Sequence, residues 1–176
     1  MNDTTSAGVQ REIRKRRKPI GFMAHVGAEI IDMAPGTCTV AVTRRPELLQ
    51  RMGWLHGGVI AFLVDNSAGI AAGTLLRADQ AVVTSEFKIN FLAPARGDRV
   101  LSRARVLKPG RRNIVVAADV FSIENGIEIH AATALATIVV VPAPVAPEAE
   151  GQSSALDSSR ESVLRTTGPQ APKPNS

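Results

Sequence analysis

Apolar and polar residues change their spacing several times along this chain, and each change predicts a different element. Residues 57–76 are apolar on nearly every side of a helical projection and contain no proline. Such a segment is typical of a helix that is buried on most of its faces. Residues 24–44 instead alternate on both sides of Ala34-Pro35-Gly36, a pattern that predicts two strands joined by a tight turn.

The second half of the chain predicts further strands. Residues 81–94 place Phe87, Ile89 and Phe91 on one face and polar residues on the other. Three more strands are expected at residues 99–108, 112–123 and 127–141, with turns at Pro109-Gly110 and Asn125-Gly126. Strands joined by hairpins form an antiparallel sheet, so we expect an α+β fold with the long helix packed on the concave face.

Composition divides the chain into one domain, at about residues 20–141, and two unlike ends. Residues 1–19 contain the basic cluster REIRKRRK, which predicts a partly disordered arm with solvated charges. A second interpretation is contact with an anionic partner. Residues 142–176 are rich in Pro, Ser and Ala and poor in large apolar residues. Such a tail buries too little surface to fold, and we expect it to be disordered.

The same composition argues against several classes of function. Aromatic residues make up only 3% of the chain, which disfavours a surface that stacks nucleic-acid bases. One cysteine and three histidines without ligand spacing predict neither a disulfide framework nor a metal site, and we expect no cofactor. A charged residue within the apolar helix disfavours a membrane span. The cytoplasm is the simplest compartment for such a chain.

The long helix carries a carboxylate where a buried helix normally has none. Asp65 is the only charged residue between His56 and Arg77. The helix opens at Gly57, and the N–H groups of a helix N-terminus stabilise a developing oxyanion. Eight residues separate Gly57 from Asp65, about 12 Å along a helix. Should both groups act on one carbonyl, they are too far apart to do so within a subunit, and two copies packed about a two-fold axis would bring them together.

The motifs of this region resemble a known family. HGGVIAFLVDNSAG resembles the central helix of PaaI-like acyl-CoA thioesterases of the hotdog-fold superfamily. VVTSEFKINFLAPARGD and VLKPGRRN resemble the strand and the turn that follow, so the resemblance covers about residues 25–141. It implies a central helix wrapped by five to six strands, and a homodimer or tetramer with active sites at the dimer interface. The implied reaction is hydrolysis of acyl-CoA to a free acid and CoA.

The resemblance also implies roles for individual residues. Asp65 matches the catalytic carboxylate, as general base or as nucleophile, and Gly57 the oxyanion-binding glycine. His56 matches the histidine that supports the thioester. Thr84 matches the hydroxyl residue that places the attacking water. The remaining implied positions are Gln50, where many relatives carry Asn, and the substrate-binding residues Gly58 and Ser85.

Each of these residues also has an ordinary structural interpretation. Asp65 has the alternative explanation of a structural carboxylate that bonds to a strand backbone. His56 suits a loop, the glycines suit a tight turn, and Thr84 suits any strand.

The phosphates of CoA require exposed cations, and the acyl group requires an apolar slot. Three cations flank one predicted turn, with two more as second candidates: Lys108, Arg111 and Arg112, then Arg96 and Arg99. A solvated hairpin is the alternative interpretation of this turn. The slot is expected to be lined by Trp54, Leu55, Phe62 and Met52.

Two other functions compete with the thioesterase. The first is a non-catalytic module that binds or senses acyl-CoA, and the second is a hotdog dehydratase or hydratase. The presence of Asp65 favours the thioesterase over the binding module, and the spacing between His56 and Asp65 favours it over the dehydratase.

Overall fold

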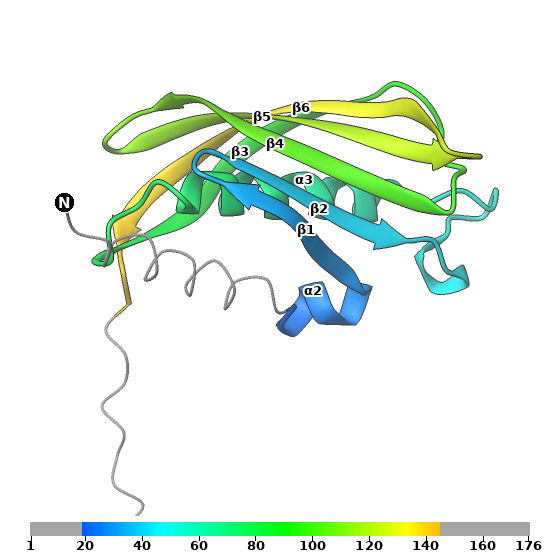
Figure 1. The fold of residues 1–176 in the computed structure, drawn as a ribbon, viewed down its shortest axis with the longest axis horizontal. Coiled ribbons are helices and arrows are strands. Elements are labelled where there is room, and N and C mark those ends of the chain that lie inside the picture. Colours follow the sequence, from blue (N-terminus) through cyan, green and yellow to red (C-terminus); the bar gives the residue numbers. More distant parts are fainter. Residues whose placement is uncertain (1–18, 145–176) are drawn as a thin grey trace, which may run out of the picture. The chain divides into compact units, whose positions relative to one another are not determined.

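The computed structural model describes residues 19–144. Its elements are, in chain order, α2 (Gly21–Val26), β1 (Ala28–Ala34), β2 (Thr37–Thr43), η1 (Pro46–Leu48), α3 (Gly57–Gly73), β3 (Gln80–Phe91), β4 (Arg99–Pro109), β5 (Asn113–Glu124) and β6 (Ile127–Pro142) (Figure 1). The basic cluster and nearly all of the C-terminal tail lie outside the described residues, so their expected disorder stays a prediction.

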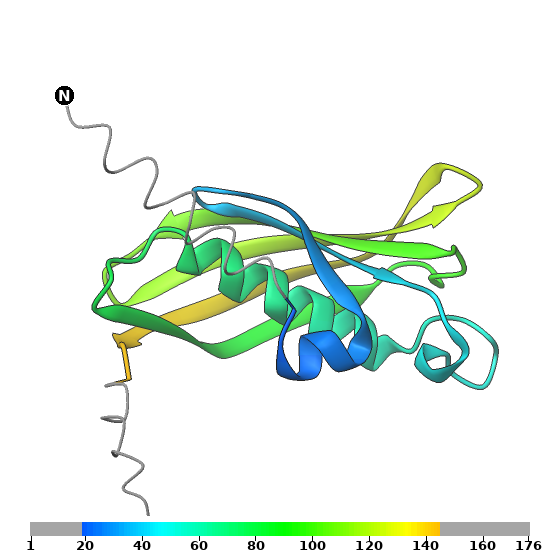
Figure 2. The same cartoon turned by 60° about the horizontal axis from the view of Figure 1, so that its bottom comes forward.

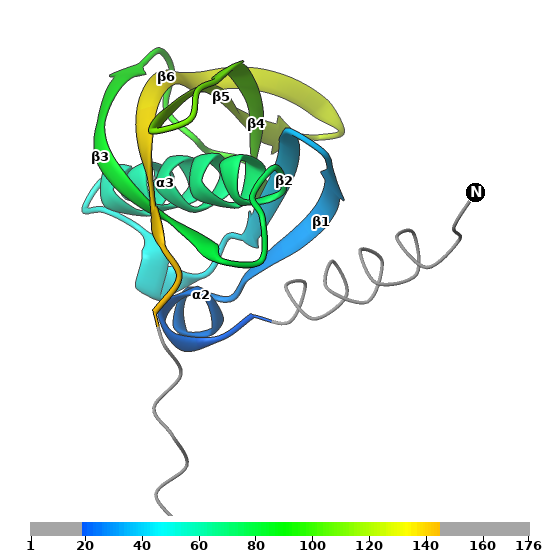
Figure 3. The same cartoon turned by 90° about the vertical axis from the view of Figure 1, so that its left-hand side faces the viewer.

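One antiparallel sheet holds all six strands, in the order β1-β2-β4-β5-β6-β3. The sheet curves around α3, which lies in its concavity (Figure 3). The predicted α+β architecture of one long helix wrapped by an antiparallel sheet is therefore confirmed. Within the part that the structure describes, no helix is long and apolar enough to cross a membrane.

Alternating apolar residues explain how the helix and the sheet form one core. On β2, Cys38, Val40 and Val42 point inward and are fully buried. From α3, Leu63 and Val64 pack into the same core. The predicted helix is therefore right in its start and in its burial, although it ends at Gly73 rather than at residue 76.

The turns that the sequence predicts join the strands at the expected places. At the β5–β6 hairpin, Asn125 has φ 52° and Gly126 has φ 81°. Both angles are positive, as a type I′ turn requires. Gly36, between β1 and β2, has φ 77°. The place of β3 at one edge of the sheet comes instead from its long-range pairing with β6.

The prediction is wrong at the start of the domain. Residues 24–26 were expected to begin a strand, but they belong to α2, and β1 begins at Ala28. Gly27 ends this short helix with φ 73°, and its N–H donates to the carbonyl groups of Met23 and Ala24. Helix α2 lies beside α3 (Figure 2), where Phe22 meets Phe62 edge-on with ring centroids 4.9 Å apart.

Candidate active site at the N-terminus of helix α3

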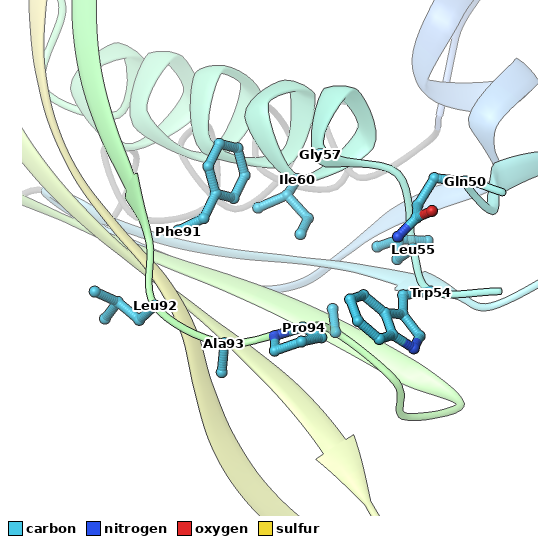
Figure 4. Close-up of a pocket in the computed structure, with 10 residues that line it drawn as sticks. Gln50, Trp54, Leu55, Gly57, Ile60, Phe91, Leu92, Ala93 and Pro94 are labelled. Atoms are coloured by element: carbon cyan, nitrogen blue, oxygen red, sulfur yellow. The ribbon is translucent and has the colours of Figure 1, made fainter. Parts of the chain in front are cut away.

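A cavity of about 330 Å³ lies at the N-terminus of α3. Its lining comes from the loop before the helix, from the first helical turn, and from the end of β3 with the loop that follows (Figure 4). The residues are Gln50, Trp54, Leu55, Gly57, Ile60, Phe91, Leu92, Ala93, Pro94 and Ala95. The lining is mostly apolar, with few polar groups, which is typical of a site for a small organic group.

His56 separates the roles of the two glycines that follow it. It is the N-cap residue of α3, and its Nδ1 accepts a hydrogen bond from the N–H of Gly58 at 2.9 Å. A Cβ at position 58 would lie 3.0 Å from that nitrogen, so glycine lets the imidazole reach its donor. Among the described residues, no group accepts from the N–H of Gly57. The donor left open at the helix N-terminus is therefore Gly57, not Gly58.

Gln50 adds a second donor to the pocket. Its Oε1 accepts from the N–H of Met52 at 2.6 Å. Its backbone N–H donates to the carbonyl oxygen of Trp54 at 2.8 Å. With the amide oxygen engaged, Nε2 is the polar atom that remains to donate, and the side-chain amide lies at the pocket lining in Figure 4. The structure thus brings Gln50, Trp54, Leu55 and Gly57 together at one cavity.

Asp65 does not line this cavity. It lies on α3, eight residues after Gly57, about 12 Å along the axis. The residue is half-buried, and its Oδ1 is fully buried with no donor in reach among the described residues. An unpaired carboxylate oxygen in this position is costly. A single copy of the chain therefore supplies the donors and the carboxylate at separate places.

The other predicted positions on α3 and β3 lie away from the cavity. Phe62 packs against Phe22 instead of lining the cavity. Thr84 is half-buried on β3, and the exposed Ser85 stands at a β-bulge, where the register shifts between Thr84 and Glu86. Seven residues separate Thr84 from Phe91, about 23 Å along a strand. Met52, whose N–H donates to the side chain of Gln50, is exposed and does not line the cavity.

The predicted cations fall into two groups. Arg96 lies near the cavity, with its Cζ 4.9 Å from the ring centroid of Trp54, and Arg99 is paired with Glu29 at 3.6 Å. The second group flanks the β4–β5 turn: Lys108, Arg111 and Arg112. That turn lies about 30 Å from the start of β4, given the rise of a strand, and so does not meet the cavity of its own chain.

Comparison with known proteins places the chain in a family. The family model described as Thioesterase superfamily matches residues 52–129. A protein of Saccharolobus solfataricus described as a candidate esterase is 38% identical over 92 residues, which are 52% of this chain and 64% of that protein. A second such protein of the same organism is 31% identical over 129 residues, 73% of this chain and 81% of that protein. The chain belongs to the thioesterase superfamily.

Further relatives agree with this assignment. The 1,4-dihydroxy-2-naphthoyl-CoA hydrolase of Listeria monocytogenes is 28% identical over 92 residues, covering 52% of this chain and 75% of that protein. A thioesterase family protein from Silicibacter pomeroyi has a crystal structure with TM-score 0.73 and 35% identity, covering 77% of this chain and 99% of that one. The PaaI protein of E. coli shares the fold, with TM-score 0.66 at 21% identity, and the match covers 76% of this chain and 93% of that one. The predictions of a hotdog fold and of a thioester hydrolase are therefore confirmed.

Sequence reasoning missed one prominent residue of this thioesterase site. Phe91 was assigned to the face of β3 that it shares with Phe87 and Ile89, yet 55% of Phe91 is exposed. Its ring Cζ lies 3.4 Å from the position of a Cβ at Gly57. The alternation of β3 gives the face correctly, but it does not reveal that the strand runs past the first turn of the helix. The ring there borders a cavity rather than the core.

Proposed function

We propose that this thioesterase hydrolyses the thioester bond of an acyl- or aryl-CoA to give a free acid and CoA. The observation that carries the proposal is the pair of donors at one apolar cavity, the open N–H of Gly57 and the amide of Gln50. The name of the Listeria relative, a CoA-thioester hydrolase, supports CoA as the leaving group.

The two donors suit the oxyanion that forms when a nucleophile adds to the thioester carbon. The N–H of Gly57 lies at the positive end of the dipole of α3, and Nε2 of Gln50 supplies a hydrogen bond from the loop. Donors that are fixed before the reaction stabilise the negative oxygen without reorganising, which lowers the barrier by several kcal/mol. His56 contributes by holding the first turn of the helix through its bond to Gly58.

The carboxylate comes, in this proposal, from Asp65 of a second copy. Phe91 of β3 lies level with Gly57, because its ring meets that residue. Asp65 lies about 12 Å further along α3. Because a strand rises ~3.3 Å per residue, Asp65 is level with a residue about four positions before Phe91 on β3, near Phe87. A two-fold axis near Ile89, halfway between, would set Asp65 of each copy opposite Gly57 of the other. It would also bring Thr84 level with Pro94 of the second copy, at the cavity.

The free edge of β3 supports such a pairing. Among the described strands, β3 pairs only with β6. Its other edge therefore carries unpaired backbone groups along twelve residues, with Val83 56% exposed. An uncovered edge of this length is a template for another strand. Antiparallel pairing of two β3 edges would join the sheets of two copies and form two equivalent sites.

The reaction then needs one carboxylate and one water. As general base, Asp65 takes a proton from water while the water oxygen bonds to the thioester carbon. As nucleophile, a carboxylate oxygen bonds to that carbon and water later cleaves the anhydride. Either way the C–S bond breaks and the sulfur leaves as CoA thiolate. Thr84 and Ser85 are the hydroxyl groups proposed to hold the water or the substrate.

Cations at both ends of the sheet are proposed to bind the phosphates of CoA. Arg96, stacked over Trp54, stands at the cavity itself. In the β3-paired dimer, the turn with Lys108, Arg111 and Arg112 of one copy would reach the cavity side of the other. From β5, which begins at that turn, the sheet continues through β6 and β3 to β3 of the other copy. The turn is therefore about three strand spacings, or ~14 Å, from β3 of the other copy. That gap is within reach of a long ligand.

A direct assay tests the proposal. Purified full-length protein is incubated with short-chain, long-chain and aryl acyl-CoAs, and release of the CoA thiol is measured. We expect hydrolysis of at least one class, and a loss of at least about 100-fold in kcat for Asp65→Asn. Binding without turnover by wild type would support the alternative of an acyl-CoA-binding module. Equal rates for wild type and Asp65→Asn would contradict the role of Asp65.

A labelling experiment distinguishes the two roles of the carboxylate. With enzyme in excess over substrate in ¹⁸O-water, the general-base route puts one ¹⁸O atom into every molecule of product acid. The anhydride route also allows water to attack the carbon of Asp65, which leaves ¹⁸O on the protein. Mass spectrometry of the product and of the peptide that contains Asp65 reports which route operates.

A further inference from the structure

The apolar lining of the cavity carries two aromatic rings. Trp54 comes from the loop before α3 and Phe91 from the end of β3. In Figure 4 they lie on opposite sides of the lining, with Ile60 and Pro94 between them. The rest of the lining is aliphatic except for the amide of Gln50 and backbone groups. Within the described residues, the cavity thus has an aromatic ring on each of two sides.

Phe91 stands directly beside the proposed position of the thioester. Its Cζ and Cε1 lie 3.4 and 3.5 Å from the position of a Cβ at Gly57, the residue whose N–H is open. A carbonyl held by that N–H would therefore place the first atoms of its acyl group against the ring. Phe91 is 55% exposed in a single copy of the chain, and an acyl group that covers the cavity side of its ring removes apolar surface from water.

We propose that Phe91 is a specificity-determining residue, whose ring, together with Trp54, selects acyl groups that are flat next to the carbonyl. This inference rests on the proposed function, because it concerns the acyl group of the same substrate. A planar aryl group fits between two rings and gains aromatic contacts. A group branched at the carbon next to the carbonyl projects a methyl out of that plane, toward the ring of Phe91.

The test compares benzoyl-CoA, which is flat, with isobutyryl-CoA, which is branched. The quantity measured is the ratio of their kcat/KM values in the full-length protein. Comparing ratios between variants cancels the different reactivity of the two esters. We expect wild type to favour benzoyl-CoA. In Phe91→Ala the ratio should fall about tenfold, the size of one aromatic contact. Phe91→Leu keeps the apolar bulk but not the flat ring, and should shift the ratio in the same direction.

A matched control is available on the neighbouring strand. Leu135 of β6 is 52% exposed and lies opposite Lys88 of β3, away from the cavity lining. Leu135→Ala removes a large exposed apolar side chain without touching the slot, so it should leave the ratio unchanged. A ratio that moves equally in Leu135→Ala and Phe91→Ala would overturn the inference. Because Phe91 lies largely outside the core, its variants should fold.

A binding measurement separates this inference from the proposed function. Trp54 is the one tryptophan of the chain, so its fluorescence reports directly on the slot. In the Asp65→Asn variant, titration with each ester should show tighter binding of benzoyl-CoA, and adding Phe91→Ala should remove the preference. Hydrolysis with a ratio unaffected by Phe91 overturns the inference and leaves the function. Ring-dependent binding without any hydrolysis supports the inference and overturns the function. If the protein shows neither hydrolysis nor ring-dependent binding, both proposals are overturned.

Discussion

At residue 57, one backbone N–H is the donor on which the proposed reaction depends. Gly57 and Gly58 are the same residue in adjacent positions, yet only Gly57 keeps an open donor, because the imidazole of His56 occupies the N–H of Gly58. The sequence predicts that an oxyanion site begins at this glycine pair. It does not predict which of the two N–H groups stays open, because that depends on the rotamer of the capping histidine. A bond from the N–H of Met52 likewise engages the amide oxygen of Gln50, which leaves its Nε2 to donate.

Two substitutions at Gly57 test the N–H alone. Gly57 occupies the first helical position after the N-cap, where proline is well tolerated, and His56 already has φ −64° and ψ 136°, which suit a residue before proline. Gly57→Pro should therefore fold but lose the donor, with kcat reduced by about 10²–10³.

Gly57→Ala is the matched control. It keeps the N–H and adds a Cβ that meets the ring of Phe91 at 3.4 Å, a tolerable contact. Most of kcat should remain, as measured by thiol release beside circular dichroism of both variants. Equal losses in the two variants would show that shape at this position matters and the donor does not.

Cys38 provides a pH-dependent test of the core. Burial raises the pKa of its thiol from 9.0 to about 12, and the charge of Asp32 adds to the effect. The folded protein therefore holds this proton when the unfolded chain has lost it. The resulting stability is complete below about pH 9 and is lost as the pH rises toward 12. We expect the free energy of unfolding in urea to fall by about 1.4 kcal/mol more for wild type than for Cys38→Ala between pH 8 and pH 10. Parallel changes in both proteins would contradict the burial of the thiol.

At the scale of elements, periodicity predicts α3 well but not its end. An apolar run to residue 76 gives no reason to stop at Gly73. The structure supplies one, because the Thr74 hydroxyl donates to the Ala71 carbonyl and accepts from the Gly36 N–H at 2.7 Å each. This threonine ties the end of the helix to the β1–β2 turn. Contacts between residues so distant in sequence are invisible to a local pattern, as is the short helix α2.

A buried hydroxyl pair fixes α3 against β4. Ser67 donates to the Val64 carbonyl at 3.2 Å, and its Oγ lies 2.8 Å from that of Ser102. Either hydroxyl can donate within the pair, and with the Ser67 proton on the Val64 carbonyl the donor is Ser102. Ser67→Ala should leave the Ser102 hydroxyl unpaired and cost about 1–3 kcal/mol of unfolding free energy. Ser102→Ala leaves Ser67 its carbonyl and should cost less. Urea unfolding of both variants checks the order, and the reverse order would contradict this network.

At the scale of the whole molecule, the eight-residue spacing from Gly57 to Asp65 predicts that one chain is not a complete site. In the structure the carboxylate stands outside the cavity, and its Oδ1 has no partner among the described residues. From the sequence, the proposed partner follows only as a requirement. Its proposed position rests on the free edge of β3, and strand order across six strands does not follow from the order of hairpins along the chain.

Complementation between two inactive variants tests the shared site most directly. Gly57→Pro and Asp65→Asn are co-expressed with different tags, and the mixed dimer is isolated through both. If each site takes Gly57 from one copy and Asp65 from the other, the mixed dimer has one intact site and one doubly altered site. We predict about half of the wild-type kcat per dimer, while each variant alone is nearly inactive. A mixed dimer as inactive as its parents would contradict a site shared between two copies.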